Sequence, residues 1–416
     1  MSLREDIEIL CLNARAAAEK LALCDTEKKN EAIRAIANQL REQTEKIIEA
    51  NTLDLAAAKD NGIANAMLDR LCINEERIKS ICQSLYALCE LEDPVGKSES
   101  WSRPSGIKIS RVRVPLGVVA IIYEARPNVT VDSAALCLKT GNAVVLRGGK
   151  EAINTNRAIV EVIKEALDSC GIDPHAVELI RSTERESANI LMSMRGYVDV
   201  LIPRGGKGLI KNVVENAKVP VIETGAGNCH VYVDEYADLN MALRVTVNAK
   251  CSRPSVCNAA ETLLVHASVA SKFLPSLGEE MTSRGVELRG CAKTCVLIPE
   301  AVAATEEDFA TEYNDYILAV KVVDTLSDAI SHINNYSTGH SEAIITANEE
   351  NSERFLKEIN SAAVYVNAST RFTDGGEFGF GAEIGISTQK LHVRGPMGLF
   401  ALTTEKYLIR GEGAVR

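Results

Sequence analysis

The sequence predicts an α/β protein made of two domains, each built around a parallel sheet. Ten short apolar runs support this prediction, because helical patterns separate them in the way that is typical of strand, helix, strand units. The first series of runs begins at residues 117, 143, 177, 198 and 219, and the second at 230, 261, 319, 341 and 363. With 416 residues, of which 46% are hydrophobic, the chain is long enough to form two cores.

Residues 1–92 precede the first series and have the pattern of packed amphipathic helices. The stretch "TEKKNEAIRAIANQLREQTEKIIEANTLDLAAAK" repeats apolar residues at three- and four-residue spacing, with charged residues between them. Asp25 lies directly before this stretch and is a suitable N-cap. We expect these helices to form a scaffold.

Two alternating segments predict strands that pair with each other. Residues 93–105, "DPVGKSESWSRPS", are rich in Pro, Gly and Ser, and we expect them to form a loop or crossing segment. The "IKISRVRVP" that follows alternates apolar and charged residues, as a half-exposed strand does. The closing "LFALTTEKYLIRGEG" also alternates, and we expect it to return and pair with the strand near residue 110. An exposed strand of this kind can also pair with a second subunit.

The composition excludes several classes of protein. A net charge of -11, with no run of lysines or arginines, disfavours binding to nucleic acid or to an anionic membrane. No stretch approaches the roughly 18 to 20 apolar residues that span a bilayer, and "MSLREDIEIL" lacks the apolar block of a signal peptide. We therefore expect a cytoplasmic protein with neither kind of partner.

The 12 cysteines are expected to be reduced thiols, because they are scattered from Cys11 to Cys295 along a chain with no export signal. Most of them should be buried as small apolar side chains. Cys251, Cys257, Cys291 and Cys295 have the spacing nearest to a metal site, but they form no C-x-x-C pair. We therefore predict no metal.

Two glycine turns at the ends of predicted strands are candidates for binding phosphate. The first, "LRGGKEA", carries Arg147 and Lys150, and the second, "IPRGGKG", carries Arg204, Gly205 and Gly206. Backbone N–H groups at a glycine turn before a helix bind phosphate well. Such turns are also often solvated loops, and neither matches a G-x-G-x-x-G or P-loop pattern. Two of them at the ends of parallel strands favour a dinucleotide.

Asn128 is a candidate oxyanion donor in "IIYEARPNVTVDSAALC", which passes from a buried strand into a helix. A side-chain amide at this junction can stabilise a developing negative charge. The alternative, that Asn128 caps the helix after Pro127, agrees equally well with the sequence.

Cys257 is the candidate nucleophile. It lies in "SRPSVCNAAETLLVH", where Pro254 and Ser255 predict a loop or helix start before the strand at 261. Arg253 would favour the thiolate of Cys257. The alternative is that Cys257 fills the core as a small apolar side chain. Cys251, on the preceding helical pattern, is expected to pack or to line the site.

Three motifs in order resemble one family. "PLGVVAIIYEARPNVTVDSAALCLKTGNAVVLRGGKEA", "NAKCSRPSVCNAAETLLVH" and "DGGEFGFGAEIGIST" closely resemble the γ-glutamyl phosphate reductases, also called glutamate-5-semialdehyde dehydrogenases, of the aldehyde dehydrogenase superfamily. The resemblance runs over essentially the whole chain. It implies an aldehyde dehydrogenase-like fold with two parallel-sheet α/β domains and a small β oligomerisation flap.

This fold implies domain boundaries and a homo-oligomer of two or more subunits. Residues 1–227 would form the cofactor domain, with about 98–114 in the flap, and 228–368 the catalytic domain. Residues 369–398 would return to the cofactor domain, and 399–416 would form the oligomerisation strand and tail.

The resemblance also assigns roles to single residues. It places Cys257 at the nucleophile position and Asn128 at that of the oxyanion donor. Glu312 is similar to the superfamily glutamate that contacts the nicotinamide ribose. Lys150 falls where relatives that prefer NAD carry an acid, so a cation there implies NADP(H). Glu223 lies near the general base of aldehyde-oxidising relatives, but its surroundings differ and it receives no role.

The implied activity is the NADPH-dependent reduction of L-glutamate 5-phosphate to L-glutamate 5-semialdehyde, with release of phosphate, through a thioester on Cys257 in proline biosynthesis. Arg253 and Arg371 are candidates to bind the phosphate or carboxylate of the substrate, although both also suit surface ion pairs. Glutamate 5-kinase, which makes this unstable substrate, is a candidate partner.

Two alternatives remain open on the sequence. An aldehyde dehydrogenase that oxidises an aldehyde to a free acid would use the same Cys257 but would need a general base and no phosphate. A nucleotide-binding regulatory protein would have kept the fold without the chemistry, although Cys257 and Asn128 argue against it.

Overall fold

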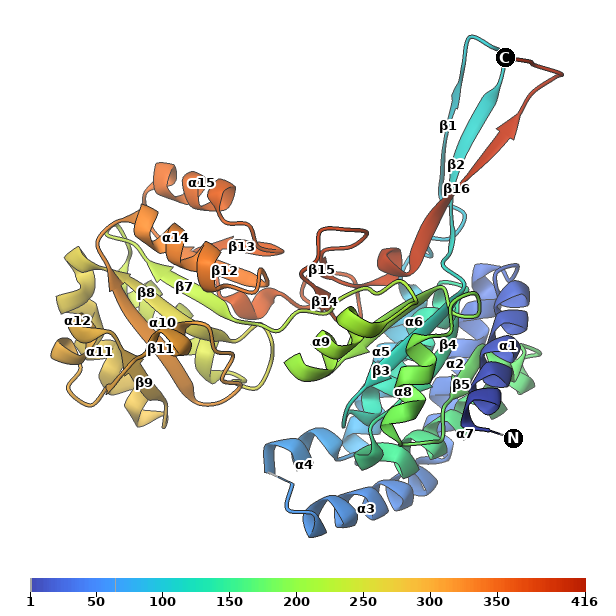
Figure 1. Ribbon diagram of the computed structural model, residues 1–416, viewed down its shortest axis with the longest axis horizontal. Helices are drawn as coiled ribbons and strands as arrows, with labels where there is room; N and C mark the ends of the chain where they lie inside the picture. The colour runs from blue at the N-terminus through green and yellow to red at the C-terminus, as the bar shows by residue number, and fades with distance from the viewer. Residues whose placement is uncertain (1, 64) are drawn as a thin grey trace. The chain divides into compact units, whose positions relative to one another are not determined.

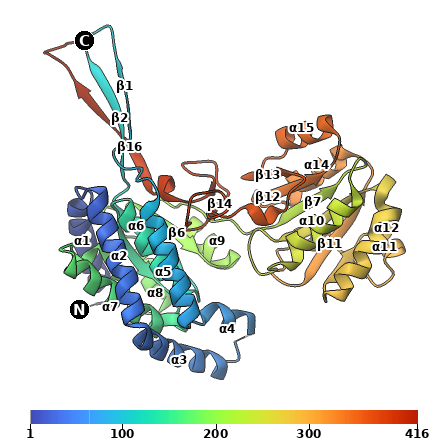
Figure 2. The same ribbon diagram turned by 180° about the vertical axis from the view of Figure 1, so that it is seen from behind.

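A computed structural model of the chain describes residues 2–63 and 65–416 and contains two compact units (Figures 1 and 2). Unit 1 comprises the residues up to Thr224 together with 379–385 and 397–416, and unit 2 comprises 225–378 and 386–396. No helix formed by the described residues is both long and apolar enough to cross a bilayer.

The N-terminal part of unit 1 is helical, as the sequence predicted. The helices are Leu3–Leu21 (α1), Thr26–Glu42 (α2), Thr44–Asp60 (α3), Asn65–Leu71 (α4) and Glu75–Glu90 (α5). The predicted N-cap is confirmed, because Asp25 Oδ1 accepts the N–H of Lys28 at 2.8 Å.

Four parallel strands form the main sheet of unit 1, in the order β5-β4-β3-β6. They are Val118–Tyr123 (β3), Ala143–Arg147 (β4), Val177–Leu179 (β5) and Val200–Arg204 (β6), and each coincides with a predicted apolar run. The run at 219 forms isolated bridges and no strand, one of them between Val221 and Leu201, so the strand predicted there was wrong. Pro220 interrupts that run and has no N–H to donate to a ladder.

Helices cover both faces of this sheet. The connecting helices are Pro127–Lys139 (α6), Ile153–Ser169 (α7), Arg185–Met192 (α8) and Lys207–Asn216 (α9). On one face, α1 and α8 bury Ile7 and Leu191 against Val118 and Val145 of the sheet. On the other face lie α6 and α7, which contact the outer helices α2, α3 and α5. The sheet is therefore buried on both faces, as parallel sheets are.

A three-stranded antiparallel sheet, called the flap below, projects from unit 1 (Figure 1). Its strands are Ser98–Ser102 (β1), Lys108–Pro115 (β2) and Thr403–Arg410 (β16). The predicted pairing of the last strand is confirmed, because β16 pairs with β2 along its whole length. The loop predicted over 93–105 was wrong for β1, which pairs with β2 in register over five residues. All residues of β1 are exposed, so it has no buried face to create an alternating pattern.

Seven parallel strands form the sheet of unit 2, in the order β10-β9-β11-β8-β7-β12-β13. They are Cys229–Val233 (β7), Ala260–His266 (β8), Glu287–Gly290 (β9), Val302–Ala303 (β10), Ile317–Val323 (β11), Ser341–Ile345 (β12) and Ala363–Val366 (β13). The five runs of the second predicted series correspond to strands. No sequence pattern indicated β9 and β10, because segments of four and two residues are too short for a periodic signal.

Helices cover both faces of this second sheet as well. They are Leu239–Cys251 (α10), Ala267–Ser283 (α11), Ala292–Leu297 (α12), Glu306–Phe309 (α13), Leu326–Tyr336 (α14) and Glu349–Glu358 (α15). Phe273 of α11 packs with Leu263 in the core on one face. Phe355 of α15 packs with Leu264 on the other, so neighbouring residues of β8 enter opposite cores.

The chain crosses between the units at positions that differ from the expected ones. The first boundary lies after Thr224, three residues before the expected one, and the segment 369–398 is divided between the units. Its beginning stays with unit 2, where Thr370 Oγ1 donates to the carbonyl oxygen of Asn258 at 2.7 Å. Residues 379–385 belong to unit 1, where the Ile384 N–H donates to the Met397 carbonyl at 3.1 Å.

A fully buried ion pair joins α10 to β8 in unit 2. Lys250 Nζ lies 2.6 Å from Glu261 Oε2, and both side chains are 0% exposed. Burial lowers the pKa of Lys250 and raises the pKa of Glu261, and the charge of each partner opposes the shift of the other. Glu261 Oε1 also accepts the N–H of Asn314 at 3.1 Å. The pair therefore fixes both ends of the loop between α10 and β8 and the segment that precedes β11.

We expect Lys250→Met to destabilise unit 2 by about 3 to 5 kcal/mol, because it leaves Glu261 buried without its partner. Hydrogen exchange of the α10 and β8 amides, measured by mass spectrometry, reports this loss locally. The double variant Lys250→Met/Glu261→Gln removes both charges but keeps an acceptor for Asn314, so it should recover most of the stability. Equal amide protection in the wild type and in Lys250→Met would contradict the prediction.

Candidate active site

Cys257 lies in the loop 252–259, which joins the end of α10 to the start of β8 in unit 2. Its side chain is partly exposed, as a nucleophile requires. Cys251, the last residue of α10, packs instead against the core of unit 2, and its sulfur lies 3.8 Å from that of Met281. Burial raises the pKa of Cys251. Of these two cysteines, Cys257 is the better placed for chemistry.

Residues at the start of β7 and just before it contact the main chain of Cys257. Cys229 Sγ donates a hydrogen bond to the Cys257 carbonyl oxygen at 3.2 Å. Gly227 packs so closely that a Cβ on it would lie 1.5 Å from the same oxygen, and therefore only glycine fits. The Gly227 N–H donates to Glu312 Oε1 at 2.8 Å. Gly227 thus brings the candidate nucleophile and the candidate ribose ligand to one place.

Both predicted substrate arginines lie near Cys257 in unit 2. Arg371 Nε donates to Ser252 Oγ at 3.1 Å, and its guanidinium also binds the side-chain oxygen of Asn258. Burial and the charge of Arg253 lower the pKa of Arg371, while Cys257 opposes this shift. Neither arginine forms an ion pair with a carboxylate within the described ranges 2–63 and 65–416. The surface ion pairs that the sequence left open are therefore not formed.

The candidate site residues of unit 2 lie at the amino ends of the strands of its sheet. Gly227, Cys257 and Glu312 each come a few residues before a strand, namely β7, β8 and β11. In this sheet the candidate residues thus lie at the amino ends of strands and not at the carboxyl ends. In parallel strands the amino ends also share one edge, so the three residues still converge.

In unit 1, Arg204, Gly205 and Gly206 lie where β6 ends and α9 begins. The N–H of Gly206 donates to Glu124 Oε2 at 2.8 Å. The next two N–H groups, at the start of α9, have no acceptor among the described residues. Arg204 Nε is buried and likewise has no acceptor within that part of the chain. These unpaired donors fit a phosphate-bearing cofactor.

The other predicted cofactor residues follow β4. Arg147 donates to the carbonyl oxygens of Thr183 and Glu184 at 2.9 and 3.0 Å, and its Nε donates to Ser187 Oγ at 3.2 Å. Its guanidinium therefore organises the loop before α8. Lys150 is exposed and makes no hydrogen bond or ion pair with the described residues, so its charge is available to a ligand.

Asn128 is the second residue of α6 and is exposed. It does not cap the helix, because Arg126 holds the cap position. Its Nδ2 donates to Asp132 Oδ2 at 3.1 Å, which orients the amide and leaves its second N–H for another acceptor. Burial raises the pKa of Asp132 to about 6, while Asn128 and Arg204 oppose this shift.

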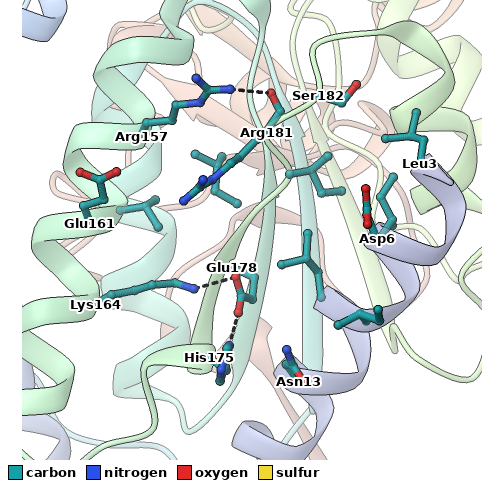
Figure 3. A pocket seen from close by; sticks show the side chains of 16 residues that line it. Leu3, Asp6, Asn13, Arg157, Glu161, Lys164, His175, Glu178, Arg181 and Ser182 are labelled. Atoms are coloured by element: carbon teal, nitrogen blue, oxygen red, sulfur yellow. Dashed lines mark hydrogen bonds and ion pairs between the residues drawn. The ribbon is translucent and has the colours of Figure 1, made fainter. Parts of the chain in front are cut away.

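A separate cavity of about 490 Å³ opens along the outer edge of β5 in unit 1 (Figure 3). Glu178 lines it and binds Lys164 Nζ at 2.7 Å and the ring of His175. The α1 lining is mostly apolar, whereas the α7 lining is mostly charged. None of the predicted cofactor residues lines this cavity, so it is distinct from the glycine turns.

Sequence reasoning missed three residues of these sites. Gly227 and Asn258 act through contacts that only the fold creates, and nothing in the local sequence distinguishes them. Glu124 had a signal, because an acid directly follows the apolar run of β3 and so lies at a strand end, where ligands bind in such sheets.

Comparison with known proteins gives the family. The model of the aldehyde dehydrogenase family matches residues 2–294 and 297–383. A γ-glutamyl phosphate reductase of Moorella thermoacetica is 58% identical over the whole of both chains. Another of the same name, from Carboxydothermus hydrogenoformans, is 58% identical over 99% of this chain and all of its own.

Solved structures agree with these matches. The crystal structure of a γ-glutamyl phosphate reductase from Thermotoga maritima is 51% identical, covers 98% of this chain and 99% of its own, and has a TM-score of 0.95. An acetylating aldehyde dehydrogenase from Geobacillus thermoglucosidasius has a TM-score of 0.70 at 17% identity over 100% and 98% of the chains, which indicates a shared fold. The chain belongs to the aldehyde dehydrogenase family and, within it, to the γ-glutamyl phosphate reductases.

Proposed function

We propose that this protein reduces L-glutamate 5-phosphate to L-glutamate 5-semialdehyde, with release of phosphate, as a step of proline biosynthesis. The names of relatives that are 58% identical over the full chain support this activity. The observation that carries it is the pair Arg253 and Arg371 beside Cys257, because a partly exposed thiol flanked by cations suits a substrate with a phosphate leaving group.

Cys257 acts as the nucleophile. Its thiolate attacks the acyl carbon, a carbon–sulfur bond forms, and the carbon–oxygen bond to the phosphate breaks, so that phosphate leaves and a thioester remains. Arg371 and Arg253 neutralise the phosphate charge during this step. A nicotinamide cofactor, when bound, would supply the hydride that reduces the thioester carbon. When the aldehyde is released, the bond to Cys257 breaks and the sulfur returns as a thiolate.

Asn128 and the backbone N–H of Cys257 are the proposed oxyanion donors. Each donor of this kind typically contributes about 3 to 4 kcal/mol to the stabilisation of the transition state. Asp132 supports the role of Asn128, because its carboxylate holds the amide nitrogen in one orientation. Glu312 is the proposed ligand of the nicotinamide ribose, and its bond to Gly227 holds it beside the nucleophile loop.

NADP(H) is the proposed cofactor. Arg204, Gly205 and Gly206 would hold its diphosphate, and Lys150 its 2′-phosphate. The charge of Lys150, which has no partner among the described residues, supports this preference over NAD. Arg147 would act indirectly, since its guanidinium is bound to the 183–187 loop.

The flap supports a homo-oligomer of two or more subunits. Trp101 and Tyr407 lie on one face of the flap at 40% and 53% exposure, in edge contact with ring centres 6.3 Å apart, and Ile409 beside them is 62% exposed. A second subunit would cover this apolar face. We also propose a cytoplasmic location and, as a partner, glutamate 5-kinase, because an unstable acyl phosphate favours direct transfer.

The reverse reaction tests the function. We expect the protein to reduce NADP⁺ with L-glutamate 5-semialdehyde only when phosphate is present, and Cys257→Ala to abolish this activity, because phosphate must take the acyl group from the sulfur. Cofactor absorbance measures the rate. Phosphate-independent activity would indicate instead an aldehyde dehydrogenase that releases a free acid.

Substitution of Arg371 tests the phosphate site. We expect Arg371→Ala to raise the KM for phosphate in the same assay by roughly 10- to 100-fold, because a charge-assisted hydrogen bond is lost. Arg371→Lys keeps the charge and should lose less. Arg284→Ala, which removes a surface arginine bound to Glu280, is the matched control. An unchanged KM for phosphate would remove Arg371 from the site.

Substitution of Lys150 tests the cofactor preference. We expect Lys150→Glu to weaken NADP⁺ binding by roughly 10- to 100-fold, because the 2′-phosphate then faces a like charge. NAD⁺ has no such phosphate, and its Kd serves as the internal control. Equal losses for both cofactors, measured by titration calorimetry, would contradict the role of Lys150.

A further inference from the structure

The strand order of unit 1 defines where a ligand would lie. The chain runs from β3 to β4 and β5 on one side and then returns to place β6 on the other side of β3. In open parallel sheets, ligands bind at the carboxyl ends of the two strands where the order reverses. Here those strands are β3 and β6, which are followed by Glu124 and by the turn Arg204 to Gly206.

Glu124, which follows β3, binds the turn that follows β6. Its Oε2 accepts the N–H of Gly206 at 2.8 Å, and its backbone N–H donates to the carbonyl oxygen of Arg204 at 3.1 Å. A Cβ on Gly205 would lie 2.6 Å from the carboxyl carbon of Glu124 and from Oε2, so glycine leaves the space that this carboxylate fills. Two independent contacts therefore hold Glu124 in the turn.

A carboxylate in this position resembles a bound phosphate. Gly206 is the N-cap of the ten-residue helix α9, and its N–H lies at the positive end of the helix dipole. The N–H groups of Lys207 and Gly208, which come next, have no acceptor in the part of the chain that the structure describes. The carboxylate of Glu124 thus partly occupies the anion-binding site at the N-terminus of α9.

We propose that the Glu124 carboxylate occupies the binding site of the cofactor diphosphate in the free enzyme. It must leave this site when the cofactor binds. This inference rests on the proposed cofactor site. A diphosphate oxygen and the Glu124 carboxylate compete for the same N–H and repel each other, so Glu124 weakens cofactor binding and speeds cofactor release.

A role of Glu124 as a cofactor ligand predicts the opposite change in cofactor affinity when the residue is removed. If Glu124 instead bound the hydroxyl groups of a cofactor ribose, its removal would weaken binding. A direct measurement of cofactor affinity therefore separates the two roles without any assay of activity.

The test uses Glu124→Ala and Glu124→Gln in the full-length protein, with the Kd of NADP⁺ measured by titration calorimetry. Removal of a charge from a helix N-terminus predicts that Glu124→Ala binds NADP⁺ roughly 3- to 30-fold more tightly. Glu124→Gln keeps an oxygen that can accept the Gly206 N–H, so its gain should be smaller. Glu215→Gln, at the other end of α9, removes one charge as well and should leave the Kd unchanged.

A cofactor fragment locates the effect. Adenosine 2′-monophosphate carries the 2′-phosphate but no diphosphate, so Glu124→Ala should not change its affinity. Weaker or unchanged NADP⁺ binding in Glu124→Ala, or equal gains for NADP⁺ and the fragment, would overturn the proposal. Failure of the wild type to bind NADP⁺ would overturn the proposed cofactor as well, and that result is visible before any variant is made.

Discussion

Parallel strand pairing is the constraint on which both units depend. Parallel strands need crossover helices, which cover both faces of each sheet and leave only the edges where the strands begin and end for a site. In unit 1 most of the candidate cofactor residues lie where β4 and β6 end, whereas in unit 2 Cys257 and Glu312 lie shortly before β8 and β11 begin. The same pairing rule therefore places candidate residues at the carboxyl ends of strands in one unit and at the amino ends in the other.

In both units a glycine then allows a neighbouring group to approach the main chain closely beside the candidate site residues. Gly227 lets the start of β7 touch the carbonyl of Cys257, and Gly205 lets the carboxylate of Glu124 enter the turn before α9. Each glycine is needed because a neighbouring group occupies the volume of a side chain. The buried ion pair of Lys250 and Glu261 holds the two ends of the loop 252–259, which carries Cys257. The position of Cys257 therefore depends on an ion pair that is shielded from solvent.

The sequence predicted what depends on periodicity and composition. The long strands, the helical scaffold, the N-cap at Asp25 and the return of β16 to β2 all leave local patterns. It did not predict β1, whose residues are all exposed, or β9 and β10, which are too short to repeat a pattern. Candidate site residues were found where residue type is distinctive, as for Cys257. Asn258 and Gly227 were missed because their partners are distant in sequence and no local signal encodes such contacts.

The flap joins segments that lie far apart in the sequence, since Thr403 pairs with Pro115 and Arg410 with Lys108. At roughly 5 to 20 residues per second, a ribosome would complete β2 on the order of 15 to 60 seconds before β16 emerges. During synthesis β2 therefore presents an unpaired edge to other nascent chains. Its three cationic residues, Lys108, Arg111 and Arg113, are the kind of charge that keeps an open edge from pairing wrongly.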